Sequence, residues 1–412
     1  MVSTQYISSK NDSIGQVFQS EKGLRRSLTL TNGVTIIVGC TIGSGIFVSL
    51  TGIQEAVGSV GSSLIVWLVC GLWCGLGSYV YAELGTMITK SGGEYVYIME
   101  AFGPFLAFIR LWIESIVVRP CTLTIVGLSF AAYVLRPIYP TCDPPILVTD
   151  LLAALLISVI GAINCWSVKV ATTVQDYLTY AKLIAIMLCM VTAAYYFFTG
   201  GPQYKESFEN IFEGNFRSIY QASVGFYSCL FAYQGWSYLN YITEELINPT
   251  RNLPLAVLFS CIIVTFTYTL FNIALYVVVS PDEVLSSPAV GVLFAEKVYG
   301  KYANILTLCV ALSCAGSANG NIMTSSRLFY CGAREGQMPT LLTMINKKLR
   351  TPIPAVALTC ILSICYLFLS SDIYVLMTTS QVTAWAAITV VAISLLRLRC
   401  KYPNATRPIK VS

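Results

Sequence analysis

The sequence has 412 residues, of which 56% are hydrophobic and 11% charged; its formal net charge is +5 and its mean hydropathy +0.70. Soluble domains carry about 25% charged residues, so this composition excludes a soluble protein and indicates an integral membrane protein. The chain has no His and shows no convergent carboxylate pair, so we expect no enzyme activity, no metal and no cofactor. We also find no basic patch of the kind that binds nucleic acid.

Apolar stretches of the length that spans a bilayer, about 20 residues, recur along the whole chain. We therefore expect an all-α integral membrane protein with a tail at 1–28, a ten-helix transmembrane core at 29–398 and a second tail at 399–412. The ten predicted helices lie near 29–54, 62–85, 98–131, 149–168, 174–198, 218–246, 254–280, 303–330, 353–369 and 374–398.

Basic residues indicate the orientation of the chain. Arg25 and Arg26 precede the first predicted helix, and Arg399 and Lys401 follow the tenth. Lys and Arg concentrate in cytoplasmic segments of membrane proteins, so we expect both termini in the cytoplasm.

Two of the predicted helices are interrupted. Gly43-Ser44-Gly45 lies in the middle of the first helix, and "FAYQGW", from Phe231 to Trp236, lies in the sixth. Irregular backbone inside a membrane must line a protein cavity, and paired interruptions in two halves are typical of transporters built on inverted repeats. The alternative for the glycines alone is a close helix–helix contact, but the second interruption favours transport.

The interruptions also predict a ligand. The start of the helix after the first break favours an anion, and carbonyls freed at the second break accept from a cation. Together they fit a zwitterion, and we expect an α-amino acid. The residues expected to contact it are Thr41, Ile42, Gly43, Ser44, Gly45, Phe231, Ala232, Gln234, Gly235 and Ser237.

Long ordered motifs connect the sequence to a family. The motifs are "GSGIF", "YAELGTMITKSGGEYVYI", "RLWIESIVVRP", "GWSYLNYITEELINPTRNLP", "SSRLFYCGAREGQMP" and "RPIKV". From about residue 24 onward the chain resembles the L-type light chains of heteromeric amino acid transporters, in the amino acid–polyamine–organocation superfamily. The resemblance implies a LeuT-like 5+5 inverted repeat with broken first and sixth helices, located in the plasma membrane. It also implies obligatory exchange of amino acids. Family members continue through two more helices, which we expect to be absent here.

The resemblance assigns roles to single residues. Phe231 matches the family's aromatic gate over the substrate. Cys142, in the second outer loop, matches the cysteine that forms a disulfide with a single-span heavy-chain glycoprotein. An unpaired cysteine on an oxidising face independently suggests an intermolecular disulfide.

Lys182 is a cation inside the fifth predicted helix, where charge is costly and usually functional. In related sodium-independent transporters, a lysine at this place substitutes for a sodium ion and bridges the first and eighth helices. We therefore expect sodium-independent transport. The alternative is a lysine that extends to the membrane interface.

The third helix and the end of the sixth carry further charges. Arg110 and Glu114 are four residues apart, so we expect an intrahelical ion pair, while Arg119 could instead meet a substrate carboxylate. Glu244 and Glu245 are expected in a gate or a structural ion network.

The substrate preference depends on two departures from large-neutral carriers. Gln234 stands where those carriers have glycine, and "SQVTAW", from Ser380 to Trp385, replaces an aromatic run. A pocket without a fixed charge favours neutral amino acids, so we expect a neutral exchanger. The alternatives are a cationic amino acid or cystine exchanger, and a truncated, non-transporting subunit that binds the heavy chain.

Overall fold

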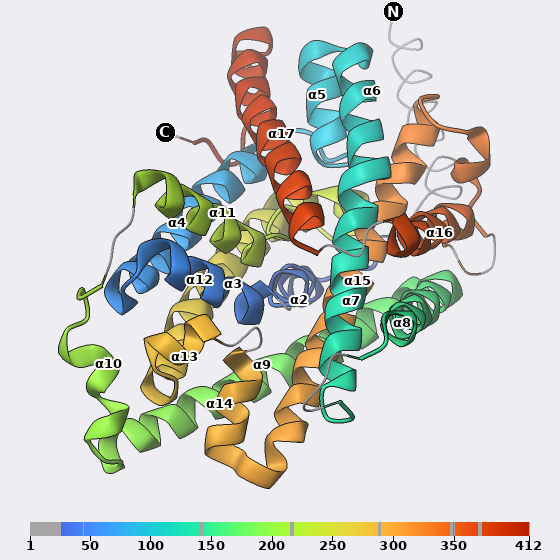
Figure 1. Ribbon diagram of the computed structural model, residues 1–412. Coiled ribbons are helices and arrows are strands. Elements are labelled where there is room, and N and C mark those ends of the chain that lie inside the picture. Colours follow the sequence, from blue (N-terminus) through green and yellow to red (C-terminus); the bar gives the residue numbers. More distant parts are fainter. Residues whose placement is uncertain are drawn as a thin grey trace, which may run out of the picture.

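The computed structural model describes residues 26–43, 45–139, 144–214, 218–286, 290–346, 349, 351–369 and 373–411. Helices dominate this part of the chain (Figure 1). An isolated parallel bridge joins Leu28 to Leu246, and the Ile247 amide donates to the Leu28 carbonyl at 2.9 Å. The segment before the first helix is thereby attached to the end of the sixth span.

Long helices form the body of the protein. Seven of the described helices are long and apolar enough to cross a membrane, or eight if α2 and α3 count as one bent span. Their outer surfaces expose large apolar side chains, such as Leu76 on α4 and Ile184 on α9. Such surfaces suit lipid rather than water. The long elements are α2 Leu30–Thr41, α3 Gly45–Val57, α4 Val60–Met87, α6 Pro104–Ile113, the π-helical η1 Glu114–Val118, α7 Arg119–Leu135, α8 Ile146–Trp166, α9 Val168–Thr199, α11 Ile219–Ala232, α12 Pro249–Val278, α15 Ala303–Arg334, α16 Ile353–Leu369 and α17 Ile373–Lys401.

Shorter elements connect the long ones. They are α5 Glu94–Phe102, η2 Pro202–Tyr204, α10 Glu206–Glu209, η3 Tyr238–Glu245, α13 Pro281–Ser286, α14 Val290–Tyr299, η4 Gly300–Tyr302 and η5 Thr340–Thr343. The sequence prediction placed residues 98–102 in the third membrane helix, and this was wrong. Gly103 has a φ of 92° and Pro104 starts a new helix, so α5 is a separate element.

The two segments with predicted interruptions lie inside the bundle. α2 lies near the centre of the view and packs against α9, α12 and α15 (Figure 1). α3 packs against α11, and α7 packs against α15. The first predicted helix is therefore packed among other helices, and Phe231 and Ala232 at the second interruption are buried. Interrupted backbone requires such an environment in a membrane.

The last described residues fold back onto α4. The Val411 amide donates to a carboxylate oxygen of Glu83 at 2.7 Å, and Arg399 and Arg407 also pair with Glu83, which is fully buried. The expected core boundary at residue 398 falls within α17, which continues to Lys401. Packing of the tail against Glu83 orders the chain beyond that helix.

Candidate functional site

The first interruption lies between α2 and α3. α2 ends at Thr41, Ile42 has non-helical backbone angles, and α3 begins at Gly45. Ser44, one of the predicted substrate residues, lies outside the described residues. A Cβ on Gly45 would lie 2.7 Å from the Cα of Ala232, so only glycine allows α3 to start this close to α11.

The second interruption follows α11, which ends at Ala232. The chain then turns and continues as the 3₁₀ helix η3. Gly235 has a φ of +123°, and a Cβ there would lie 2.9 Å from the Thr41 hydroxyl oxygen. The ends of the two interrupted segments therefore touch each other through glycines.

A cavity of about 30 Å³ lies where these ends meet. It has room for a water molecule but not for an amino acid. Six of the predicted substrate residues line it, together with residues of α7 and α15. The lining comprises Cys40, Thr41, Gly43, Gly45, Thr122, Val126, Phe231, Ala232, Gln234, Tyr238, Ser317 and Asn321.

The other predicted substrate residues have different positions. Gly235 and Ser237 line a neighbouring cavity of about 40 Å³, which Gln234 also lines. Ile42 is fully buried, and its carbonyl accepts hydrogen bonds from Lys182 and from the Ser313 hydroxyl. The ten predicted positions thus divide between two adjoining cavities and a buried contact with α9 and α15, with Ser44 undescribed.

Carbonyls at the helix ends already have hydrogen-bond donors nearby, and two of them share one hydroxyl. The Tyr268 hydroxyl lies 2.7 Å from the Thr41 carbonyl oxygen and 2.8 Å from that of Ala232. The Phe231 carbonyl accepts from the Gln234 amide at 3.0 Å. A carbonyl oxygen accepts two hydrogen bonds, so each keeps capacity for a substrate ammonium group.

Lys182 lies on α9 and is 2% exposed. Its ammonium group donates to the carbonyls of Gly39 at 2.8 Å, Ile42 at 2.6 Å and Ser313 at 3.0 Å. These carbonyls belong to the end of α2 and to α15. A side chain so buried does not extend to a membrane interface, and the ammonium group instead links three helices beside the first interruption.

The two departures that were noted in the sequence meet in the structure. The Gln381 side-chain amide donates to the side-chain oxygen of Gln234 at 3.1 Å. Gln381 lies on α17 and is 4% exposed, while Gln234 lies in the turn after α11. This neutral pair connects α17 to the second interruption.

A buried ion network lines the neighbouring cavity. Arg110 pairs with Glu114, as the spacing predicted, and also with Glu94 at 2.6 Å. Arg119 pairs with Glu114 at 2.7 Å, and its guanidinium lies 4.3 Å from the ring centroids of both Tyr238 and Tyr241. The protein thus supplies the partners of Arg119, including a carboxylate.

A second charged layer follows along α15. Arg327 pairs with Glu245 at 2.7 Å, and both side chains are nearly fully buried. Arg334 pairs with Glu244 at 2.8 Å at the end of the helix. The two glutamates therefore belong to an ion network, as expected, and they attach η3 to α15.

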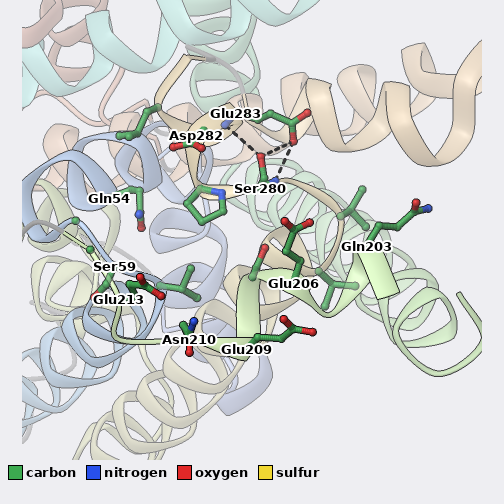
Figure 2. A pocket seen from close by; sticks show the side chains of 18 of the residues that line it. Gln54, Ser59, Gln203, Glu206, Glu209, Asn210, Glu213, Ser280, Asp282 and Glu283 are labelled. Carbon is green, nitrogen blue, oxygen red and sulfur yellow. Dashed lines mark hydrogen bonds between the residues drawn. The ribbon is translucent and has the colours of Figure 1, made fainter. Parts of the chain in front are cut away.

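Another cavity, of about 1060 Å³, is lined by none of the ten predicted substrate residues (Figure 2). Six carboxylates line it: Glu55 from α3, Glu206, Glu209 and Glu213 from the connection between α9 and α11, and Asp282 and Glu283 from α13. A hydrogen bond from Lys297 holds the pKa of Glu283 below its usual value. Among the described residues, no group of three or more Cys, Asp or Glu is arranged to hold a metal ion. Against the six carboxylates, the described lining has the single cation of Lys297, so it is an acidic cavity.

Sequence reasoning missed several residues that line the cavity of about 30 Å³, above all Ser317 and Asn321 on α15. A signal was available, because Ser313, Ser317 and Asn321 recur every four residues and so lie on one face of a helix. Cys142, the predicted disulfide residue, lies outside the described residues.

Comparisons with known proteins identify the family. A family model described as amino acid permease matches residues 28–412. The human cystine/glutamate transporter is 41% identical over 95% of this chain and 78% of its own length. The mouse large neutral amino acids transporter small subunit 2 is 44% identical over 94% of this chain and 73% of its own, and the mouse b(0,+)-type amino acid transporter 1 is 41% identical over 94% and 79%.

The fold also has a solved counterpart. Mhp1, a nucleobase-cation-symport-1 family transporter in a closed conformation, aligns over 92% of this chain and 80% of its own with a TM-score of 0.62 and 11% identity. This likeness shows the LeuT-like, all-α membrane transporter fold. The relatives are named as transporters, in agreement with the argument against an enzyme. The chain therefore belongs to the amino acid permease family, among the light chains of heteromeric amino acid transporters, and its activity is amino acid transport.

Proposed function

We propose that this chain is a sodium-independent exchanger of neutral amino acids that acts in the plasma membrane as the light chain of a heterodimer. The observation that carries the proposal is the position of the Lys182 ammonium group. It contacts three carbonyls of α2 and α15 at 2.6 to 3.0 Å, beside the first interruption. A protein cation in this position leaves no need for a sodium ion to hold the two helices together.

The α-amino and α-carboxyl groups of the substrate would bind where the interrupted segments meet. The start of α3 at Gly45 offers the amides and the positive end of a helix dipole to the carboxylate. The end of α11 at Phe231 and Ala232 offers carbonyls to the ammonium group. Because the cavity is only about 30 Å³, the helices around it must separate before an amino acid enters. Alternating opening toward the two sides of the membrane would supply that movement.

Neutral side chains fit the electrostatics of the site. Gln234 and Gln381 satisfy each other without charge, and Arg119 is already paired with Glu114. A charged substrate side chain would enter a buried site without a free counter-charge, which is costly. The site thus favours neutral amino acids over Lys, Arg or Glu.

The test is exchange in liposomes that contain the purified protein. With labelled leucine outside and unlabelled leucine inside, the rate of label uptake should be the same in sodium and in choline buffers. Liposomes that contain the protein but no internal leucine should take up little label. Uptake that needs sodium, or that proceeds at the same rate into empty liposomes, would contradict the proposal.

The heavy-chain partner is tested separately. We expect a disulfide between Cys142 and a single-span glycoprotein, with both termini of this chain in the cytoplasm. Co-expression followed by a non-reducing gel should show a high-mass band that disappears in Cys142→Ser. A band that survives the substitution would refute this assignment.

A cystine exchanger is the main rival, because one group of relatives carries that name. Cystine is larger than leucine and carries a second zwitterionic group. To separate a neutral exchanger from a cystine exchanger, cystine and arginine are compared with glutamine and methionine as inhibitors of leucine exchange. Stronger inhibition by cystine than by the neutral amino acids would favour the rival.

A further inference from the structure

A polar stripe runs along one face of α15, a helix that is otherwise largely apolar. Its members are three or four residues apart, so they lie on the same side of the helix, and two of them, Ser317 and Asn321, line the small cavity. The stripe consists of Ser313, Ser317, Asn321, Thr324 and Arg327.

The members on either side of Asn321 are fully engaged. The single hydroxyl hydrogen of Ser317 is directed to the carbonyl oxygens of Gly39 and Cys40, each 3.2 Å from the hydroxyl oxygen. The Thr324 hydroxyl accepts from Arg119 at 2.8 Å. At the ends of the stripe, the Ser313 carbonyl accepts from Lys182 and Arg327 pairs with Glu245, as described above.

Asn321 differs from its neighbours. It is 1% exposed and lines the small cavity together with Thr122, Phe231 and Gln234. Its side-chain oxygen accepts from the Ser325 hydroxyl at 3.0 Å, whereas its side-chain amide nitrogen has no hydrogen-bond partner. Ser325 thus holds the oxygen and leaves the N–H group for a different acceptor.

An unpaired buried N–H group is costly, by about 1–3 kcal/mol, and native proteins contain few of them. The cavity beside Asn321 is where the proposed function places the substrate. A substrate oxygen would satisfy the group whenever the site is occupied, which explains why the chain keeps it unpaired.

We propose that Asn321 determines substrate preference within the neutral class. Its amide nitrogen donates a hydrogen bond to an uncharged oxygen in the substrate's side chain, such as the amide carbonyl of glutamine. The inference rests on the proposed function and adds a substrate class to it. Apolar side chains of the same length bind less well because they leave the N–H group unpaired.

The acceptor is an uncharged oxygen rather than a carboxylate. One neutral N–H group does not compensate the burial of a full negative charge. Arg119, a cation that contacts the stripe at Thr324, is already held by Glu114, Thr324 and two tyrosine rings. Glutamate therefore lacks a counter-charge where glutamine has its donor.

The experiment compares methionine with methionine sulfoxide, which adds one uncharged oxygen to the same skeleton. Both are measured as inhibitors of leucine exchange and, independently of transport, as ligands that raise the melting temperature of the purified protein. The wild type should prefer the sulfoxide by about tenfold, as one satisfied buried donor predicts. Asn321→Leu, which is similar in size and lacks the donor, should remove this preference or reverse it.

Asn164→Ala is the matched control. Asn164 is also a buried asparagine with one unpartnered side-chain atom, but it contacts Asn319 on another face of α15. This variant should keep the wild-type preference for methionine sulfoxide over methionine. If Asn321→Leu does not fold, Asn321→Ala takes its place.

Two results would overturn the inference: a wild type that prefers methionine, or an Asn321 variant that keeps the sulfoxide preference. Failure of the proposed function looks different. In that case exchange itself would be absent or sodium-dependent. The difference in affinity between methionine sulfoxide and methionine, measured by melting temperature, would still report on Asn321.

Discussion

Replacing Lys182 by methionine is the sharpest test of how the first interruption is held. Methionine keeps most of the length and apolar volume of the side chain but removes the ammonium group. The wild-type group donates three hydrogen bonds, to Gly39, Ile42 and Ser313. The substitution therefore removes only the cation that links α2 to α15.

The magnitude follows from those three bonds. Hydrogen bonds to charged groups contribute about 1.5–3 kcal/mol each, so the gross loss is roughly 4–9 kcal/mol. Removing the charge recovers about 2.5–3.5 kcal/mol of burial cost. The carbonyls of Gly39 and Ile42 also keep bonds from the hydroxyls of Ser317 and Ser313. We therefore expect the substitution to destabilise the arrangement in which Lys182 links α2 to α15 by about 1–6 kcal/mol, or roughly 5- to 20,000-fold in its population.

Leucine exchange in liposomes measures the effect, with the amount of inserted protein matched between variants. Lys297→Met is the control, because Lys297 is 36% exposed and pairs with Glu283 outside the transport site. Exposed pairs contribute little, about 0–1 kcal/mol, so this variant should exchange nearly as fast as the wild type. If Lys182→Met exchanges leucine at the wild-type rate, the role given to the ammonium group is refuted.

Three further predictions concern the site. Gly235→Ala should slow exchange at least tenfold, because a Cβ would lie 2.9 Å from the Thr41 hydroxyl at a strained φ; unchanged initial rates would mean that the two interruptions do not need this contact. Gln234→Asp should make arginine an inhibitor of leucine exchange, and the absence of any gain in arginine inhibition would remove Gln234 from the specificity site. Glu245→Gln should lower the melting temperature of the purified protein, because Arg327 would keep a buried charge without a carboxylate, at a cost of about 3–5 kcal/mol; an unchanged melting temperature would show that the pair is not structural.

The sequence predicted structure well where a single residue type is unusual in its surroundings and therefore requires particular neighbours. A lysine in an apolar helix needs buried acceptors, and Lys182 has three. Glycines in an apolar helix either permit close approach or interrupt it. At Gly45 the approach to Ala232 is observed, and α3 also begins there. The inverted-repeat relation between the two halves and the substrate roles of these residues stay predictions.

The sequence was less informative where function depends on pairs that are distant along the chain. Gln234 and Gln381 were each noticed as departures, but their hydrogen bond requires α17 to lie beside the turn after α11. Glu83 gave no signal, because its partners Arg399 and Val411 meet it only in the folded tail. The recurrence of Ser313, Ser317 and Asn321 indicated a polar helix face, but the sequence did not show which cavity that face lines.

The position of the bound substrate tests the account most directly. A cryo-electron microscopy structure of the chain with its heavy chain, prepared in saturating glutamine, would locate it. The account predicts glutamine between the start of α3 and the end of α11, with its side-chain oxygen within hydrogen-bond distance of the Asn321 amide nitrogen. Glutamine in the large acidic cavity, or sodium bound in place of the Lys182 ammonium group, would contradict it.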